Sequence, residues 1–210
     1  MTDRQVFPPL VLRATGLSCG RGGMMLCENL DFSVPSGQCL LLRGPNGTGK
    51  TTLLLTLAGI VAPLEGFFAY EGHDGETAPI HYCGHRNAVK PRLTVSENLG
   101  FWRAMNGPTG LGVDAALAEV GLEDLRDLDA GYLSAGQTRR LALARLLVSQ
   151  RPVWLLDEPT AALDSAGHDL VTRLIERHLD LGGLVVAATH DPITLADPGR
   201  MAVLTLGAPL

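Results

Sequence analysis

The segment at residues 44–51 constrains the fold of this chain more than any other part of the sequence. It reads Gly-Pro-Asn-Gly-Thr-Gly-Lys-Thr, which matches the phosphate-loop pattern G-x-x-x-x-G-K-S/T. The apolar run at residues 38–43 predicts a buried strand before the loop, and residues 50–57 predict a helix after it. A strand, a glycine-rich loop and a helix in this order are the setting in which such a loop binds phosphate.

Each residue type in this loop has a role in holding a nucleotide. Glycines let the backbone wrap closely around phosphate oxygens, so that amide N–H groups point inward. Lys50 is expected to reach the β- and γ-phosphates, Thr51 to hold Mg²⁺ through its hydroxyl, and Thr52 to contact the α-phosphate. The predicted ATP-binding residues of the loop are Gly44, Pro45, Asn46, Gly47, Thr48, Gly49, Lys50, Thr51 and Thr52.

Two acidic residues follow a second apolar run at residues 153–156. This run predicts a buried strand, which places Asp157 at its carboxyl end, beside the phosphate loop. Asp157 is suited there to order Mg²⁺ and its waters. Glu158 is suited to orient or deprotonate the attacking water. The pair therefore predicts hydrolysis of ATP.

The order of the predicted elements indicates an α/β fold with a mainly parallel sheet. Residues 184–189 predict a third buried strand, and residues 165–181 before it have apolar residues at helical spacing. Residues 95–103, 114–119 and 138–149 predict three helices with no strand between them.

These patterns predict one domain over residues 1–210. Residues 90–150 are expected to form a helical subdomain. It is inserted into an α/β core that consists of residues 1–89 and 151–210.

Composition excludes several classes of function. The net charge is −5, which argues against a nucleic-acid partner, because such surfaces need clustered Lys and Arg. The apolar run at residues 53–64 is shorter than the about 20 residues of a membrane-spanning helix, so any membrane link is expected to come through a partner. The four cysteines form no C-x-x-C pair, which predicts reduced, buried thiols rather than a zinc site.

A short motif precedes the stretch that predicts the helix at residues 138–149. Residues 133–137 read Leu-Ser-Ala-Gly-Gln. Ser134 before small residues is an ordinary helix N-cap, and the exposed N–H groups of such a helix start also form a site for an anion. Its place inside the predicted helical insertion, before the strand that carries Asp157, favours a functional role over that of a simple helix cap.

The phosphate loop, residues 133–137, the acid pair, the Ala-Leu-Asp sequence at residues 162–164 and His190 after a strand together resemble the ABC ATPase family. The resemblance covers nearly the whole chain. It implies a P-loop NTPase (RecA-like) core with a mainly parallel sheet, an N-terminal antiparallel β portion and an inserted helical subdomain. It also implies that ATP and Mg²⁺ bind at the loop.

The resemblance further implies a site shared by two copies of the chain. The copies are expected to pair head to tail, so that residues 133–137 of one copy, the signature motif, close over the γ-phosphate held by the other. Asp164 is expected to communicate across that interface, and His190 is expected to contact the γ-phosphate. The nucleotide-contacting residues implied outside the loop are Ser134, Gly136, Gln137 and Asp164, and the catalytic residues implied are Lys50, Glu158 and His190.

Two departures from the family pattern are visible. The family usually carries Gln after the strand that ends near Gly84, whereas this chain has His85 and Arg86 there. His85 is expected to take the place of that Gln as a catalytic-site residue, with a charge that varies with pH. Residues 15–22 hold no aromatic side chain to stack on adenine, and Cys19 or Arg21 occupies that region.

A further reading of the same stretch concerns metal or haem ligation. His81, Cys83 and His85 alternate, so a strand would place them on one face. The stretch overlaps the loop that senses the γ-phosphate in the family, and the nucleotide role is favoured for that reason.

The sequence around His85, residues 93–102 and Ala135 resembles one subfamily, the ATPases of the cytochrome c maturation complex, often called the haem exporter. This resemblance implies a transmembrane permease partner resembling CcmB, with CcmC-like and CcmD-like subunits. It implies a location at the cytoplasmic face of the inner membrane. An ATPase of another ABC transporter and a soluble ABC ATPase remain alternatives, whereas a regulatory module without turnover and a kinase fit the intact acid pair less well.

Overall fold

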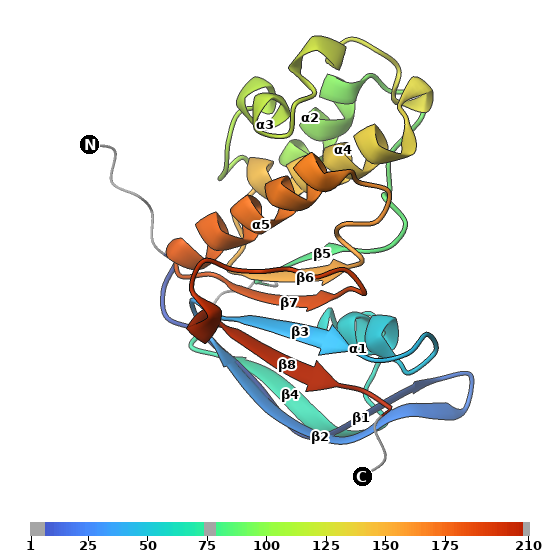
Figure 1. Cartoon of the computed structure of the whole chain (residues 1–210), viewed down its shortest axis with the longest axis vertical. Coiled ribbons are helices and arrows are strands. Elements are labelled where there is room, and N and C mark those ends of the chain that lie inside the picture. The colour runs from blue at the N-terminus through green and yellow to red at the C-terminus, as the bar shows by residue number, and fades with distance from the viewer. Residues whose placement is uncertain (1–6, 74–78, 208–210) are drawn as a thin grey trace. The chain divides into compact units, whose positions relative to one another are not determined.

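The computed structural model describes residues 7–73 and 79–207, and these residues form two compact units (Figure 1). The sheet unit takes the chain up to Gly84, then Pro152–Glu158, and the part from Thr172 onward. The helical unit takes His85–Arg151 and Pro159–Val171. Each unit is described by itself below.

A five-stranded parallel sheet forms the centre of the sheet unit, with the strand order β5-β6-β7-β3-β8. Every residue of β6 and β7 is buried, which explains why both strands read as continuous apolar runs. The strands are β3 (Cys39–Arg43), β5 (Ile80–Cys83), β6 (Val153–Asp157), β7 (Leu184–Ala188) and β8 (Met201–Thr205).

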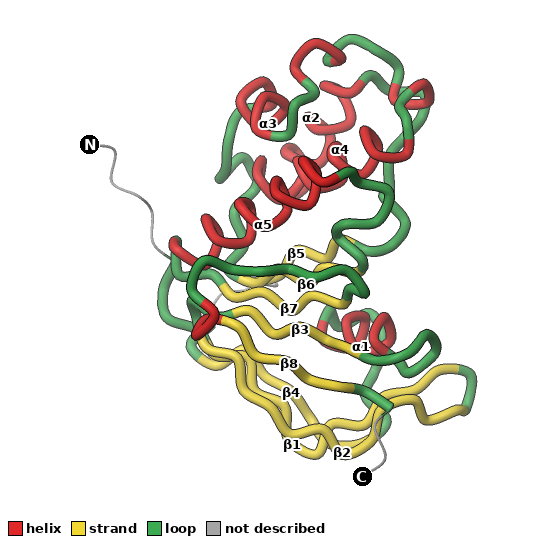
Figure 2. The backbone as a smooth tube through the Cα atoms, in the orientation of Figure 1, coloured by secondary structure: helices red, strands yellow, loops and turns green. Residues whose placement is uncertain are grey.

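A three-stranded antiparallel sheet belongs to the same unit, in the order β2-β1-β4. Its strands are β1 (Val11–Arg21), β2 (Met24–Pro35) and β4 (Glu65–Glu71). Figure 2 shows α1 (Lys50–Leu57) next to these strands and the end of β3.

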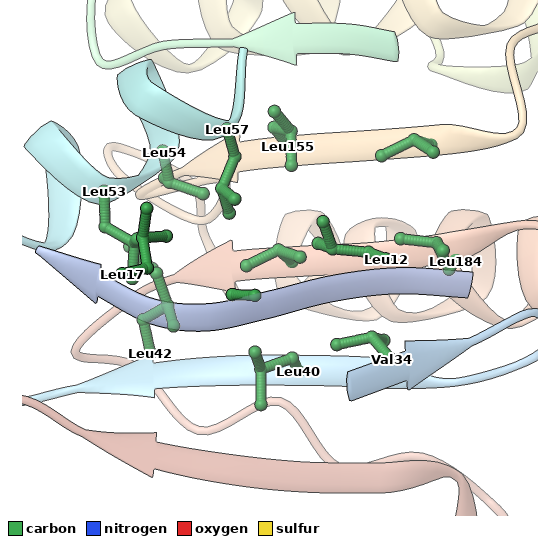
Figure 3. Packing of buried hydrophobic residues seen from close by; sticks show 14 of the residues in the cluster. Leu12, Leu17, Val34, Leu40, Leu42, Leu53, Leu54, Leu57, Leu155 and Leu184 are labelled. Atoms are coloured by element: carbon green, nitrogen blue, oxygen red, sulfur yellow. The ribbon is translucent and has the colours of Figure 1, made fainter. Parts of the chain in front are cut away.

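An apolar core joins the two sheets and α1, and leucine supplies most of it (Figure 3). Full burial of one leucine contributes about 1.5–3 kcal/mol, so this cluster anchors both ends of the phosphate loop. The labelled members of the cluster are Leu12, Leu17, Val34, Leu40, Leu42, Leu53, Leu54, Leu57, Leu155 and Leu184.

The helical unit contains three complete α-helices, α2 (Val95–Asn106), α3 (Val113–Glu119) and α4 (Ala135–Val148). Two 3-10 turns, Glu123–Leu125 and Ala130–Tyr132, connect α3 to α4. A fourth helix, α5 (Ser165–Asp180), begins in this unit and ends in the sheet unit. A further 3-10 turn, Pro198–Arg200, belongs to the sheet unit and precedes β8.

The predicted fold class is confirmed: the chain has a mainly parallel sheet, an N-terminal antiparallel portion and an inserted group of helices. Over the inserted stretch, which is fully described, the structure has no strand, only an isolated bridge between Thr94 and Asp129. The expected limits of the helical subdomain, residues 90–150, stay a prediction.

Two helices differ from their predictions by three residues at one end, whereas α3 and α5 differ by a single residue. The helix predicted at residues 138–149 begins at Ala135, because Ser134 caps it three residues earlier. The helix predicted at residues 95–103 continues to Asn106 and ends at Gly107, which has a φ of 89°.

Two further predictions concern the membrane and the cysteines. Within the described ranges, no helix is both long enough and apolar enough to cross a bilayer. The four cysteines, all of them among the described residues, are buried and form no disulfide, as predicted. They are Cys19, Cys27, Cys39 and Cys83.

Candidate nucleotide-binding and hydrolysis site

The phosphate loop depends on three glycines with positive φ, Gly44 at 141°, Gly47 at 86° and Gly49 at 96°. A Cβ atom at Gly44 would collide with the carbonyl oxygen of Leu206, and one at Gly49 would press on Cys27. A Cβ at Gly47 would meet no atom within 4 Å, so only the backbone conformation favours glycine there. The loop is therefore fixed by close packing on both sides and open in its middle.

Lys50 is buried and lies against this loop. Its Nζ donates hydrogen bonds to the carbonyl oxygens of Gly44, at 2.7 Å, and Pro45, at 2.9 Å. The helix that Lys50 opens has Gly49 as its N-cap and no side-chain cap, so backbone N–H groups face outward from its first turn. An ammonium group and a helix N-terminus together form a site for an anion such as a phosphate.

Thr51 and Asp157 bring a hydroxyl and a carboxylate together. The Thr51 hydroxyl lies 3.2 Å and 3.0 Å from the two carboxylate oxygens of Asp157 and donates to them. Asp157 is the last residue of β6 and is only 3% exposed. Mg²⁺ prefers such hard oxygen ligands and needs only one or two from the protein beside phosphate and water, so this pair fits the ion.

Glu158 sits in a left-handed conformation with a φ of 49°. Its N–H donates to the carbonyl oxygen of Ala188 at 2.7 Å, which extends the pairing of β6 and β7 by one bond. Non-glycine residues at positive φ are uncommon, and those that occur are concentrated in turns and active sites. Here the conformation turns the chain immediately after Asp157 and leaves the carboxylate of Glu158 only 22% exposed.

His190 connects Glu158 to the phosphate loop. Its backbone N–H donates to Glu158 Oε2 at 3.2 Å, and its ring Nε2 lies 3.6 Å from Glu158 Oε1. The same Nε2 lies 2.8 Å from Asn46 Oδ1. The structure therefore brings a loop residue, a histidine and a carboxylate into one hydrogen-bonded set, all within the sheet unit.

The signature motif lies in the helical unit at the start of α4. Ser134 and Gln137 form a capping box: the Ser134 hydroxyl accepts from the Gln137 N–H at 3.2 Å, and the Gln137 side chain accepts from the Ser134 N–H at 2.9 Å. Gly136 lies close to the chain at Ala162, where an added Cβ would come within 3.0 Å of the carbonyl oxygen. A side chain at position 136 would therefore crowd the helix start.

Asp164 lies in the same unit, just before α5. Its Oδ1 accepts from the Gly167 N–H at 2.9 Å and lies 3.4 Å from Arg140 Nη2. The Gly167 hydrogen bond and the nearby Arg140 charge hold the pKa of Asp164 below its usual value. The carboxylate therefore ties the start of α5 to α4 within the helical unit.

His85 is exposed and lies in the helical unit, in the segment that follows β5. Two arginines of α4 hold this segment at Asn87: Arg139 Nη1 donates to Asn87 Oδ1 at 2.9 Å, and Arg145 Nη1 donates to its carbonyl oxygen at 2.8 Å. The guanidinium of Arg145 also stacks over the Trp102 ring, 4.0 Å from its centroid. The segment that carries His85 is thus fastened to the helix that carries the signature.

The structure also describes the residues that were considered as adenine contacts or metal ligands. Of the two residues weighed for adenine, Cys19 is fully buried and Arg21 is exposed. The ligand set His81, Cys83 and His85 gains no support, because no group of three suitable side chains within the described chain could hold a metal ion. His81 and Cys83 are buried on β5.

Sequence reasoning identified most side chains of this site but missed their connections. The contact between Asn46 and His190 joins residues 144 positions apart, and no local pattern signals it. Arg43 was read only as the end of a strand, although its guanidinium donates to the backbone on both sides of His190.

Comparison with known proteins agrees with this geometry. A family model described as ABC transporter matches residues 27–161. The cytochrome c biogenesis ATP-binding export protein CcmA of Nitrobacter winogradskyi is 51% identical over 188 residues, which cover 88% of this chain and 94% of that protein. The protein of the same name from Agrobacterium fabrum is 50% identical over 193 residues, which cover 88% of this chain and 91% of that protein.

Two solved structures share the fold. A putative ABC transporter ATP-binding protein from Pyrococcus furiosus has a TM-score of 0.80 and 25% identity, and the match covers 93% of this chain and 97% of that chain. A bacterial Atm1-family ABC exporter with ATP bound has a TM-score of 0.78 and 24% identity over 97% of this chain and 38% of that chain, a likeness that concerns the fold alone. The phosphate loop, the acid pair and these matches show that the chain belongs to the ABC transporter family, as an ATP-binding and ATP-hydrolysing subunit.

Proposed function

We propose that this chain is the ATPase that energises the export step of cytochrome c biogenesis. The observation that carries the proposal is the single hydrogen-bonded set that joins Asn46 of the phosphate loop, His190 and Glu158 beside the Thr51–Asp157 pair. That set supports ATP hydrolysis. The relatives of about 50% identity, whose name is cytochrome c biogenesis ATP-binding export protein, support the pathway.

ATP binding is assigned to the loop and to the residues that follow it. Lys50 exchanges its bonds to the loop carbonyls for the β- and γ-phosphates, and the backbone N–H groups of the loop, which Pro45 lacks, surround the phosphate oxygens. Thr52 is buried in the first turn of α1, and we assign it the contact with the α-phosphate. Thr51 and Asp157 would hold Mg²⁺, which neutralises phosphate charge when it is bound.

Hydrolysis is assigned to Glu158 and His190. Glu158 orients a water against the γ-phosphate and takes a proton from it, which is general-base catalysis. His190 keeps the Glu158 carboxylate in place through its backbone N–H and presents its imidazole beside Asn46 of the loop. The imidazole is then positioned to donate a hydrogen bond to the γ-phosphate.

A complete site needs a second copy of the chain. The start of α4 carries Ser134, which is exposed, and Gly136 and Gln137, which are half-buried, and its backbone N–H groups suit an anion. In a head-to-tail pair, this start closes over the γ-phosphate held by the partner, and Asp164 lies at the same interface. The Arg140 and Gly167 contacts of Asp164 support that role, because they tie the start of α5 to α4.

The membrane partner is assigned from the same resemblance. We infer a transmembrane permease like CcmB, with CcmC-like and CcmD-like subunits, and a peripheral location at the cytoplasmic face of the inner membrane. His85 lies in a segment fastened to α4 through Asn87, which suits a residue that relays the permease state to the signature. Haem export or release of a haem-loaded carrier would then be the work that hydrolysis drives.

The proposal is tested in cells that carry Lys50→Ala in place of the wild-type chain. Covalent haem should disappear from c-type cytochromes, because ATP no longer binds productively, while b-type cytochromes remain. The measurement is a haem stain of denatured membrane proteins beside a difference spectrum for b-type haem.

A matched control removes a positive charge elsewhere in the sheet unit. Arg173 is exposed on α5, so Arg173→Ala should leave the stained bands at their wild-type intensity. Normal c-type bands in the Lys50→Ala cells would contradict the pathway and leave only the ATPase of another transporter.

A further inference from the structure

Arg43 makes an unusual pair of contacts for the last residue of a buried strand. Its Nη1 donates to the carbonyl oxygen of Thr189 at 2.5 Å, and its Nη2 donates to the carbonyl oxygen of Asp191 at 3.0 Å. These two carbonyl groups flank His190 on either side. One guanidinium therefore holds the backbone across the histidine.

Residues 189–191 lie just beyond the pairing of β3 and β7. The parallel ladder between β3 and β7 ends at the pair of Leu42 and Ala188. Beyond that pair the chain turns, with the Asp191 N–H donating to the Thr189 hydroxyl at 3.1 Å. Arg43 reaches past the end of the ladder and donates to two backbone carbonyl oxygens beyond it, those of Thr189 and Asp191.

The guanidinium is well suited to this task. Its nitrogens form a rigid planar fork, so two bonds from one group fix both the spacing and the direction of the acceptors. Thr189 is only 1% exposed, so water is a poor substitute for the donor at its carbonyl oxygen. The backbone of Arg43 is anchored as well, because the Leu206 N–H donates to its carbonyl oxygen at 2.8 Å.

We propose that Arg43 is a positioning residue for His190: it clamps residues 189–191 so that the imidazole and the backbone N–H of His190 stay aligned with Asn46 and Glu158. The proposal rests on the proposed function, since it concerns the residues assigned to hydrolysis. It adds a part that lies outside the phosphate-loop pattern, directly before Gly44. The clamp also fixes the position of the phosphate loop, which begins at Gly44, relative to the residues that follow β7.

A different role for Arg43 would be to attract phosphate through its charge. The two roles predict different behaviour of a lysine variant. Lysine keeps the charge but is a point donor without a fork, so Arg43→Lys restores a charge effect and only part of a two-bond clamp. Arg43→Met removes both the charge and the donors while keeping a long apolar stem.

The experiment measures two properties of the full-length chain for the wild type, Arg43→Met and Arg43→Lys. The first is amide hydrogen exchange of the peptide that contains residues 189–191, followed by mass spectrometry. The second is steady-state ATP hydrolysis, with ATP affinity measured separately. Arg13→Met is the matched control, because Arg13 is also an arginine on a strand with a side-chain partner, Glu71, but lies on the surface.

The clamp predicts faster exchange at residues 189–191 in Arg43→Met, by about tenfold or more, which corresponds to about 1.4 kcal/mol or more. It predicts a kcat lowered about tenfold or more with ATP affinity within about twofold of the wild type. Arg43→Lys should fall between the wild type and Arg43→Met in both measurements, and Arg13→Met should match the wild type.

Unchanged exchange in Arg43→Met, or a loss of ATP affinity that Arg43→Lys restores fully, would overturn the clamp. If Arg43→Met does not fold, Arg43→Lys alone decides, since wild-type exchange and kcat in that variant contradict a two-bond fork. The exchange measurement does not depend on turnover. If Glu158→Gln hydrolysed ATP as fast as the wild type, the proposed function would be overturned. The exchange measurement would still test the clamp.

Discussion

Acidification from pH 7 to pH 5 should destabilise the folded chain by about 2 kcal/mol through His178 alone. His178 is 3% exposed, and its ring stacks on Trp154 with 3.9 Å between centroids and 11° between planes. Phe7 packs against it in an edge-type arrangement, with 5.5 Å between ring centroids. His178 Nε2 lies 3.1 Å from the carbonyl oxygen of Pro152, an acceptor that a neutral imidazole satisfies by donating from this nitrogen.

Burial disfavours the charged form and lowers the pKa of His178 from 6.5 to about 3, partly against the Pro152 hydrogen bond and with help from nearby His81. In the unfolded chain the group titrates near its ordinary pKa, so below about pH 6.5 the unfolded state binds a proton that the folded state refuses. The stabilisation is therefore fully present above that pH and is lost as the pH falls toward 3. The two pKa values give about 2 kcal/mol at pH 5 and about 1.4 kcal/mol for each further unit down to about pH 4.

The assay is urea unfolding at pH 7 and pH 5 for the wild type and His178→Gln. Glutamine can still donate to the Pro152 carbonyl but has no proton to gain, so the variant should lose about 2 kcal/mol less than the wild type between the two pH values. The comparison within each protein cancels the effect of the lost stacking on Trp154. If both proteins lost the same free energy on acidification, the buried neutral state of His178 would be refuted.

Three further predictions concern the shared site, the segment after β5 and the thiols. Ser134→Arg should stop hydrolysis while leaving ATP binding intact, and wild-type turnover should rise more than linearly with protein concentration; a linear rise from a monomer would count against a shared site. His85→Ala should lower permease-coupled hydrolysis more than ATP affinity, with recovery in His85→Gln; equal loss in both variants would point to Arg86 or the backbone instead. All four thiols are buried, and burial raises the pKa of the Cys39 thiol to about 12, so the native chain should resist iodoacetamide at pH 8 whereas the urea-unfolded chain takes up four labels; rapid native labelling would contradict the packing.

The local elements of this fold could be predicted because their signals are local. The helix from Lys50 to Leu57 has the predicted bounds, since the loop fixes its start and the chain turns at Gly59, which has a φ of 71°. Strands β6 and β7 are buried at every position, so their continuous apolar runs identified them. The start of α4 was missed by three residues, although Ser134 was weighed as an ordinary N-cap as well as an anion site; its capping box with Gln137 sets the boundary at Ala135.

The candidate site was predictable in its residue types but not in its connections. Spacing along the chain placed Asp157 at the carboxyl end of a strand and Lys50 at the start of a helix, and the parallel sheet brings these ends together. Nothing in the sequence shows that Asn46 reaches His190, or that Arg43 spans the backbone of residues 189–191. Such contacts depend on which strands neighbour each other, and β3 lies next to β7 only in the folded sheet.

The most direct test of the account compares ATP binding and ATP hydrolysis in the wild type and Glu158→Gln. The amide cannot take a proton from water, and general-base catalysis contributes about 10²–10⁴-fold, so hydrolysis should fall to about 1% of the wild-type rate or less while ATP affinity is kept. Glu65→Gln, at an exposed position on β4, is the matched control and should hydrolyse ATP normally. Hydrolysis at the wild-type rate in Glu158→Gln would contradict the assignment of the catalytic site.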